Sequence, residues 1–283
     1  MLDYFLGFLV LYSLYNRVQF FINKKKIGKV PLLRGARPIH YEGGETGVFI
    51  IHGLTSSPFE MRYLASFLKE RGYSVSVPLL PGHGTIPEDL YTTTWQDWIN
   101  AAEKDLIEFK KKHKNVFLIG SSNGGVMALH IASRHKELKG VVSMAAPMFF
   151  RKNKLLKLLV HVLYLIKINQ KKYYFNKRDR RVTKNKAHYK VIPLKSLKEC
   201  LKLIKVTKTL LPRVSVPALV IQSDTDYQID INNAKYIYNN LGSKDKKLFI
   251  VHNAYHVIAE DPNKKKRQQV FKKIDSFIKK HSK

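Results

Sequence analysis

A serine between glycines is the part of the sequence best suited to covalent chemistry. Residues 120–124 read Gly-Ser-Ser-Asn-Gly, which has the form G-x-S-x-G with Ser122 at its centre. The apolar run at 116–119 predicts a buried strand before it, and residues 124–135 predict a helix after it. A sharp strand-to-helix turn requires glycine at its flanking positions and holds the serine oxygen exposed at the helix N-terminus. The spacing therefore predicts Ser122 as the nucleophile of an acyl-transfer reaction.

A second loop could stabilise the charge that such a reaction develops. Acyl transfer places negative charge on one oxygen, which two backbone N–H groups can bind. One candidate donor is the N–H of Asn123, the residue after Ser122. The other lies in the loop after the apolar run at 48–51, where Gly53 allows close backbone approach and Leu54 offers its N–H. His52 is expected to brace this loop.

Serine is a weak nucleophile unless a histidine, oriented by a carboxylate, takes its proton. For a serine on a strand-to-helix turn, the acid and then the histidine follow later in the chain. The predicted strand 218–222 is followed by Asp224, Asp226 and Asp230, of which Asp226 is favoured as the acid.

The base has two candidates, since the predicted strand 248–251 is followed by His252 and His256. His252 lies at the strand end, where a structural role is expected. His256 lies in the loop beyond it and is favoured as the base.

These residues need a scaffold that brings distant loops together. Short apolar runs predict strands at 48–51, 74–77, 116–119, 141–144, 218–222 and 248–251. Helical patterns lie between them at 58–71, 95–112, 124–135 and 232–240, with a last helix at 270–280. This alternation predicts an α/β fold, a mostly parallel sheet with helices on both faces and a site at the carboxyl ends of the strands.

The sequence resembles the α/β-hydrolase superfamily, in particular serine hydrolases of the carboxylesterase and monoacylglycerol lipase type. The strings that carry the resemblance lie at residues 52–53, 79–85, 94–98, 120–125, 217–229 and 256–257. The resemblance implies an α/β-hydrolase fold with a helical cap and no metal or organic cofactor. It also implies the catalytic residues Ser122, Asp226 and His256, with Leu54 and Asn123 as oxyanion donors. Two residues depart from the group: Asn123 stands where methionine is usual, and Tyr255 where glycine is usual.

Three functions are compatible with these residues. The first is a serine esterase that cleaves small-molecule or lipid esters, such as monoacylglycerols. The second is a catalytically silent, membrane-bound binding protein, which Asn123 and Tyr255 would favour. The third is acyl transfer to an acceptor other than water, which uses the same three side chains.

The alternation breaks at about residues 148–212, where the resemblance implies a cap inserted into the hydrolase domain. Residues 155–168 are apolar on every helical face, residues 171–190 are densely basic, and residues 194–211 are cationic and amphipathic. An apolar wall beside a basic rim suits an acyl chain with a headgroup in water. An ordinary cap core with solvated lysines is the alternative.

The N-terminal residues 1–30 are predicted to form an apolar membrane-associated segment ahead of the hydrolase domain at 31–283. Residues 4–15 are almost entirely apolar, and three lysines follow at 24–26. An interfacial helix or a single span fits this pattern, with the hydrolase domain on the cytoplasmic side of the membrane. A helix docked on its own domain, in a soluble cytoplasmic protein, is the alternative.

The net charge of +30 comes from 51 basic and 21 acidic side chains, and residues 151–215 hold 20 of the basic ones and only 2 of the acidic ones. This concentration indicates either an anionic membrane surface as a partner or solvated lysine faces. No nucleic-acid partner is expected, because helix-turn-helix, zinc-finger and RNA-recognition patterns are missing from the sequence. The single cysteine excludes an intramolecular disulfide.

Overall fold

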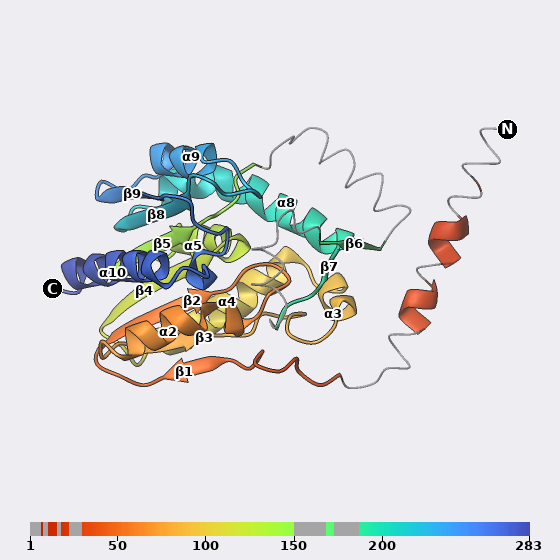
Figure 1. Ribbon diagram of the computed structural model, residues 1–283, viewed down its shortest axis with the longest axis horizontal. Coiled ribbons are helices and arrows are strands. Elements are labelled where there is room, and N and C mark those ends of the chain that lie inside the picture. Colours follow the sequence, from red (N-terminus) through yellow and green to blue (C-terminus); the bar gives the residue numbers. More distant parts are fainter. Residues whose placement is uncertain (1–6, 8–10, 16–17, 23–29, 150–167, 173–186) are drawn as a thin grey trace.

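The computed structural model describes residues 7, 11–15, 18–22, 30–149, 168–172 and 187–283. Its centre is a seven-stranded sheet of order β1-β3-β2-β4-β5-β8-β9 (Figure 1). The strands are β1 (Ile39–Tyr41), β2 (Thr46–Ile51), β3 (Ser74–Val77), β4 (Asn115–Ser121), β5 (Gly140–Met144), β8 (Ala218–Ser223) and β9 (Lys246–Val251). Every neighbouring pair is parallel except β1 and β3. The predicted mostly parallel sheet is confirmed.

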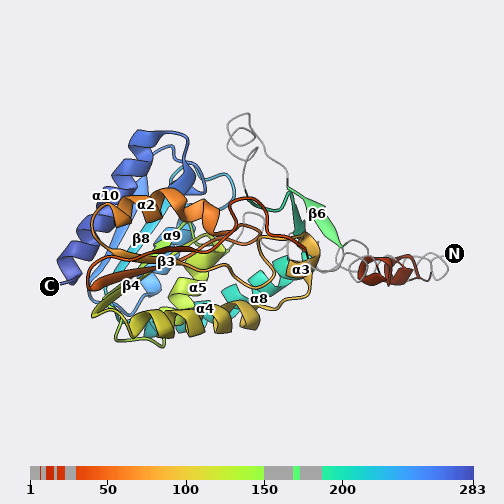
Figure 2. The same ribbon diagram turned by 90° about the horizontal axis from the view of Figure 1, so that it is seen from below.

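Helices cover both faces of the sheet, as the alternating pattern predicts. One face carries α2 (Arg62–Lys69) and α10 (Lys264–His281), and the other carries α4 (Trp95–Lys110), α5 (Asn123–Ala132), α8 (Leu194–Leu210) and α9 (Asn232–Asn240) (Figure 2). The strands supply both cores by alternation: Phe49 and Ile51 pack on the α4 and α5 side, while Val48 and Ile50 pack on the α2 and α10 side. Strands buried on both faces account for the continuous apolar runs in the sequence.

Some element boundaries differ from the prediction. The predicted helix 58–71 is a 3-10 turn, Pro58–Met61, followed by α2. Helix α10 begins at Lys264 rather than at residue 270, because the Asn263 side chain accepts from the N–H groups of Lys265 and Lys266 and caps the helix there. The short elements that were not predicted include the edge strand β1, the helix α3 (Pro87–Tyr91) and two short strands in the insertion, β6 (Asn169–Lys171) and β7 (Val191–Pro193).

The strand order places a crevice at the carboxyl ends of β2 and β4. From β2 the chain pairs with β3 on one side, and β4 then returns to the other side of β2. Such a reversal opens a crevice between the two loops that leave the neighbouring strands. Gly53 follows β2 and Ser122 follows β4, so the two predicted halves of the site meet here.

The insertion between β5 and β8, residues 148–212, is described in part. Strand β6 (Asn169–Lys171) pairs antiparallel with β7 (Val191–Pro193), and α8 follows directly. Helix α8 has the predicted amphipathic pattern, with Cys200, Leu203 and Ile204 buried against the core. Most of the predicted apolar stretch 155–168 and of the basic stretch 171–190 lies outside the described residues.

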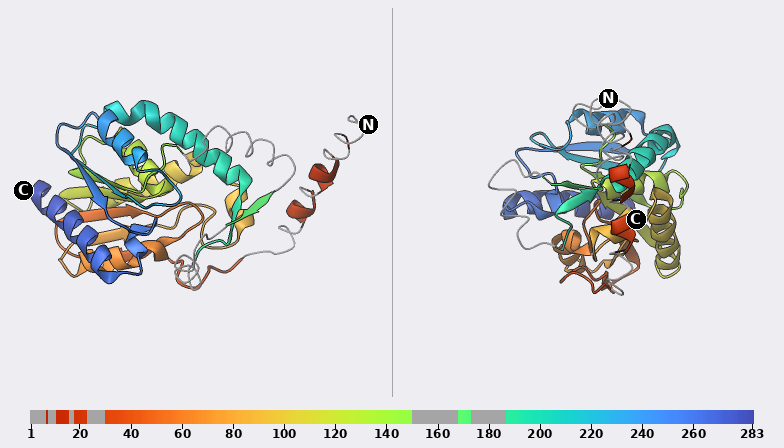
Figure 3. Two further views of the ribbon diagram at one scale, coloured as in Figure 1. Left: turned by 45° about the horizontal axis from the view of Figure 1, so that its top comes forward. Right: turned by 90° about the vertical axis from the view of Figure 1, so that its right-hand side faces the viewer.

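The described N-terminal residues are helical and lie on the side of the molecule that carries β6 and β7, away from the C-terminus (Figure 3). Phe20 is buried, and its ring centroid lies 4.8 Å from that of Tyr91 on α3. The large apolar side chains exposed around it are Leu11, Tyr12, Leu14, Tyr15, Val18, Phe21 and Ile22. Within the described ranges, none of the helices combines the length and hydropathy needed to cross a membrane.

Candidate active site

The turn that carries Ser122 depends on its two flanking glycines. Ser122 has φ 54° and ψ −122°, a strained conformation for a residue with a side chain. A Cβ on Gly120 would lie 2.0 Å from the carbonyl oxygen of Gly124, and a Cβ on Gly124 would lie 2.3 Å from that of Ile51. Both glycines are therefore required for β4, α5 and β2 to pack this closely. The close packing holds Ser122 between the strand and the helix.

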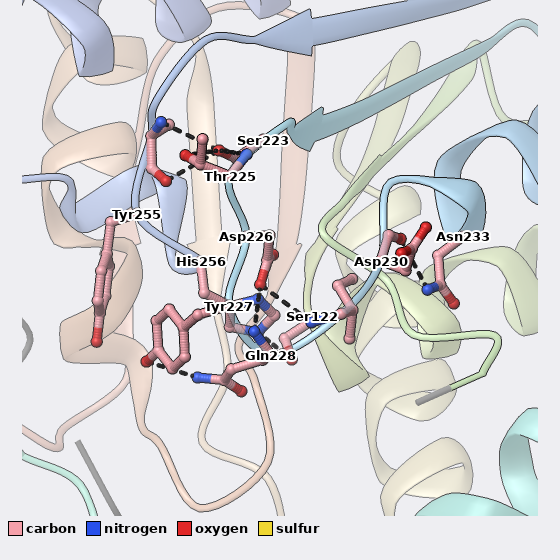
Figure 4. Close-up of polar contacts among 12 residues, drawn as sticks. Ser122, Ser223, Thr225, Asp226, Tyr227, Gln228, Asp230, Asn233, Tyr255 and His256 are labelled. Atoms are coloured by element: carbon pink, nitrogen blue, oxygen red, sulfur yellow. Dashed lines mark hydrogen bonds and ion pairs between the residues drawn. The ribbon is translucent and has the colours of Figure 1, made fainter. Parts of the chain in front are cut away.

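Ser122, His256 and Asp226 form one hydrogen-bonded chain (Figure 4). His256 Nε2 lies 3.1 Å from Ser122 Oγ, and His256 Nδ1 lies 2.6 Å from Asp226 Oδ2. The other carboxylate oxygen of Asp226 accepts from the N–H groups of Gln228 and Ile229, at 2.8 and 3.1 Å. The acid is thus fixed in orientation, and the imidazole is placed to accept a proton from the serine hydroxyl.

The tyrosine before His256 does not displace it. Tyr255 is buried, and its N–H donates to Asp261 Oδ2 at 2.5 Å. Its ring centroid lies 6.0 Å from that of Tyr227, which also lies 6.4 Å from the ring of His256. The loop therefore accommodates the larger side chain and still brings His256 to Ser122.

The other candidates for acid and base lie elsewhere. His252 Nδ1 pairs with Asp224 Oδ2 at 2.7 Å, but the His252 side chain is 87% exposed. Hydrogen bonds from the Asn253 N–H and from His252 hold the pKa of Asp224 below its ordinary value. Asp230 accepts from the N–H of Asn232 at the start of α9. Neither Asp224 nor Asp230 is placed against His256.

The loop after β2 lies against Ser122. A Cβ on Gly53 would lie 3.4 Å from Ser122 Cβ, and the Gly53 N–H donates to Glu60 Oε1 at 3.3 Å. The N–H groups of Leu54 and Asn123 donate to no other residue in the described part of the chain. Both are available to an oxygen bound beside Ser122.

His52 braces this loop. Its Nδ1 lies 3.0 Å from the carbonyl oxygen of Gly53, and its Nε2 accepts from the N–H of Leu80 at 3.3 Å. Burial lowers the pKa of His52, so the ring is neutral and can donate at one nitrogen while it accepts at the other. The structural role expected for His52 agrees with these contacts.

Ser122 opens into a cavity of about 480 Å³, to which the β5–β8 insertion contributes one wall. Its apolar lining includes Leu54, Pro147, Ile192, Leu197, Ile229 and Val257, and its polar lining includes Glu60, Gln170, Lys171, Lys172 and Gln228. Asn123 and Cys200 also line it, with the thiol donating to Asn123 Oδ1 at 3.0 Å. Burial raises the pKa of Cys200 to about 12, so it remains a thiol. The contribution of Cys200 was missed in the sequence, since only packing brings α8 to Asn123.

The described residues contain no group of three or more histidine, cysteine, aspartate or glutamate side chains placed to hold a metal ion. Three polar groups close to Ser122 have hydrogen-bonding roles within the protein. Asp226 orients His256, Glu60 accepts from the Gly53 N–H, and Asn123 accepts from the Cys200 thiol. The described geometry is the one that a serine nucleophile and a histidine base would require.

Comparison with known proteins supplies the family. Residues 45–263 match the sequence model of the serine aminopeptidase S33 family. The chain belongs to this family. It is 31% identical over 239 residues to the thermostable monoacylglycerol lipase of Bacillus sp. (strain H-257), a match that covers 82% of this chain and 90% of the relative. It is also 28% identical over 246 residues to a carboxylesterase of Bacillus subtilis (strain 168), over 86% of this chain and 96% of the relative.

A solved structure reported for the metagenome-derived lipolytic enzymes LipS and LipT superposes on this S33 family member with a TM-score of 0.81 at 30% identity. The superposition covers 89% of this chain and 100% of the other. The prediction of an α/β-hydrolase of the carboxylesterase and monoacylglycerol lipase type is confirmed, and so is the prediction of an enzyme.

Proposed function

We propose that this enzyme hydrolyses carboxylic esters with medium or long acyl chains, such as monoacylglycerols, with Ser122 as the nucleophile. The observation that carries the proposal is the chain of hydrogen bonds from Ser122 through His256 to Asp226, at the edge of a largely apolar cavity. The relatives named monoacylglycerol lipase and carboxylesterase support the same substrate class.

In the first step, Ser122 Oγ attacks the ester carbonyl carbon while its proton moves to His256 Nε2, 3.1 Å away. The Nδ1–H of His256 donates to Asp226, which selects this tautomer and stabilises the imidazolium. His256 then returns the proton to the leaving alcohol. The products of this step are the free alcohol and an ester between the acyl group and Ser122.

In the second step, water repeats the sequence on the acyl-enzyme. His256 accepts a proton from the water as the water oxygen attacks the acyl carbon, and it returns that proton to Ser122 Oγ. The fatty acid leaves and the serine hydroxyl is restored. In both steps, the N–H groups of Leu54 and Asn123 would bind the negative oxygen of the tetrahedral intermediate.

The cavity supports a preference for longer acyl chains. Leu197 on α8 and Ile192 on β7 place apolar surface from the insertion opposite the apolar residues of the core loops. Each methylene removed from water in such a cavity contributes about 0.8 kcal/mol. Esters with chains long enough to reach this wall should therefore react with higher kcat/KM than acetate esters.

A series of monoacylglycerols from two to twelve acyl carbons tests this proposal. We expect kcat/KM to rise along the series and Ser122→Ala to abolish the reaction. The neighbouring Ser121→Ala is the matched control, because Ser121 is buried at the end of β4 and does not line the cavity. A kcat/KM that stays flat or falls with chain length would contradict the preference for lipid esters. An active Ser122→Ala variant would contradict the mechanism.

We also propose that the enzyme attaches to the cytoplasmic face of an anionic membrane through residues 1–30 and the basic β5–β8 insertion. Seven large apolar side chains are exposed on the described helical residues at the N-terminus, and residues 151–215 carry 20 basic side chains. Apolar insertion alone gives marginal binding, and basic groups near an anionic surface add about 1 kcal/mol each.

Vesicle flotation tests the attachment on the full-length protein. Leu14→Ser with Val18→Ser should reduce flotation with anionic vesicles, because both side chains are more than half exposed. Tyr63→Ser with Ile107→Ser is the matched control, since these exposed apolar residues lie on α2 and α4, outside both proposed attachment regions. Equal flotation of both variants, or no flotation of the wild type, would contradict the proposal.

A further inference from the structure

We propose that Tyr189 is a positioning residue that holds the loop Gly53–Ser57, here called the oxyanion loop, in its reactive conformation. The inference rests on the proposed function, because it assumes that the Leu54 N–H binds the developing oxyanion. Tyr189 acts through the backbone of this loop and has no role as a proton donor or nucleophile.

The oxyanion loop has few contacts of its own to fix it. Thr55 has φ 63°, a region that residues with a Cβ seldom adopt. Within the loop, the Ser56 N–H donates to the Gly53 carbonyl oxygen at 3.2 Å, and the Thr55 hydroxyl donates to that of Leu54 at 2.5 Å. A strained conformation of this kind persists only where its surroundings hold it. The main restraints on the loop must therefore come from elsewhere in the chain.

Two further restraints come from residues 187–189 of the β5–β8 insertion, just before β7 and more than a hundred residues along the chain. The Tyr189 N–H donates to the carbonyl oxygen of Thr55 at 2.9 Å. The Ser57 hydroxyl donates to the carbonyl oxygen of Ala187 at 2.6 Å. The two hydrogen bonds hold the loop at Thr55 and at Ser57, on the C-terminal side of Leu54.

The Tyr189 side chain fixes this part of the insertion to the core. Its hydroxyl donates to the Gly82 carbonyl oxygen at 2.8 Å and accepts from the Thr85 N–H at 3.0 Å. Tyr189 is only 3% exposed, and burial raises the pKa of its hydroxyl, which therefore remains a donor. The phenol thus joins the 82–85 loop to the oxyanion loop through the backbone of Tyr189.

The two oxyanion donors are consequently held in different ways. The Asn123 N–H is fixed by the packing of β4, α5 and β2 around Gly120 and Gly124. The Leu54 N–H is held at Gly53 by His52 and Glu60, and on its C-terminal side it depends on the contacts of Tyr189 and Ser57. Loosening those contacts should weaken binding of the transition state while leaving the cavity that binds the ground state in place.

The test compares Tyr189→Phe and Ser57→Ala with the wild-type enzyme on a monoacylglycerol substrate. We expect kcat to fall about tenfold in each variant, less than the loss of a whole oxyanion donor, and KM to change by less than about twofold. The double variant should lose less than the product of the two effects, because both substitutions release the same loop.

Two inhibitors separate positioning from general damage. A long-chain trifluoromethyl ketone forms a tetrahedral adduct with Ser122, whereas an alkyl glycerol ether of equal length binds without reaction. The Ki of the ketone should rise by the factor by which kcat/KM falls, and the Ki of the ether should stay within about twofold. If the Ki of the ether rises as much as that of the ketone, or if neither changes, the proposal is wrong.

Tyr73→Phe is the matched control for removing a buried tyrosine hydroxyl. Tyr73 is buried before β3, and its hydroxyl donates to Asp275 Oδ1 on α10 at 2.8 Å, at the opposite end of the sheet from Ser122. The Tyr73→Phe variant should leave both Ki values unchanged. If it raised the Ki of the ketone as much as Tyr189→Phe does, the proposal would be overturned. If Tyr189→Phe does not fold, Ser57→Ala decides the matter by the same criteria.

The same experiment separates this inference from the proposed function. Ser122→Ala must be inactive and must bind the ketone no better than the ether if the proposed function holds. Where Ser122→Ala behaves in this way but Tyr189→Phe and Ser57→Ala leave the ketone Ki unchanged, only the positioning role fails.

Discussion

Two Asp–His pairs connect the same two loops, and of these two only the inner pair, Asp226 and His256, lies beside Ser122. The loop after β8 supplies Asp224 and Asp226, and the loop after β9 supplies His252 and His256. Both pairs use Nδ1 of the imidazole, at 2.7 Å in the outer pair and 2.6 Å in the inner pair. The hydrogen-bond geometry of the two pairs is therefore nearly the same.

Their surroundings differ. The side chains of the outer pair are 87% and 31% exposed, whereas those of His256 and Asp226 are 3% and 0% exposed. An ion pair in water contributes little, while a buried, fully bonded pair holds one tautomer in one orientation. The second nitrogen of His256 reaches Ser122. Burial and the neighbour at Nε2 are therefore what distinguish His256, the proposed base, from the surface histidine His252.

The largest expected effect separates the two histidines. His256→Ala should lower kcat/KM for ester hydrolysis by at least about 10⁴-fold, since serine then has no proton acceptor. His252→Ala should stay within about twofold of the wild type. Initial rates on a p-nitrophenyl ester give both values, and the reverse result would assign the base to the outer pair.

A smaller effect should separate the two acids. Asp226→Asn should lower kcat by about 10³- to 10⁴-fold, because an amide donor facing Nδ1 favours the wrong tautomer of His256. Asp224→Asn removes the same charge from the exposed pair and should change kcat by less than about threefold. Equal losses in the two variants would show that charge, and not orientation of the imidazole, is what Asp226 supplies.

The smallest expected effect concerns the free energy of unfolding. It comes from His130, a buried histidine that, unlike His252 and His256, forms no hydrogen bond to a carboxylate in the described part of the chain. Burial lowers the pKa of His130, which lies on α5 and contacts Thr207 on α8, to about 4. The unfolded chain binds a proton at this residue near pH 6.5 and the folded chain does not, so the free energy of unfolding should fall as the pH drops from 6.5 towards 4. His130→Gln should reduce that slope by up to about 1.4 kcal/mol per pH unit. Urea unfolding at several pH values measures it, and parallel curves for the two proteins would contradict the assignment.

Much of the fold could be predicted because its signals are local. The apolar runs indicate strands at their own positions, and the glycines around Ser122 indicate a sharp turn at theirs. Strand β3 and helix α9 were predicted with the bounds that the structure has. The position of His256 beyond the strand end was also sufficient to place it near Ser122. These features depend on residues that are close together in the sequence.

The remainder depends on contacts between distant segments. Tyr189 forms hydrogen bonds with Thr55 and Gly82, and Cys200 forms one with Asn123. No local sequence pattern at these residues predicts the contacts. The edge strand β1 pairs on one side only, so its three residues lack the apolar run of a central strand. Sequence patterns therefore predicted the half of the site built on the sheet, and not the half held by the insertion.

Covalent labelling with a fluorophosphonate tests the central claim, that Ser122 is a nucleophile activated by His256, most directly. Intact-mass and peptide analysis should find one phosphonyl group on Ser122 in the wild type. Ser122→Ala should carry none, and His256→Ala should react far more slowly than His252→Ala. A label on another residue, or an enzyme that hydrolyses esters while Ser122 stays unlabelled, would contradict the account.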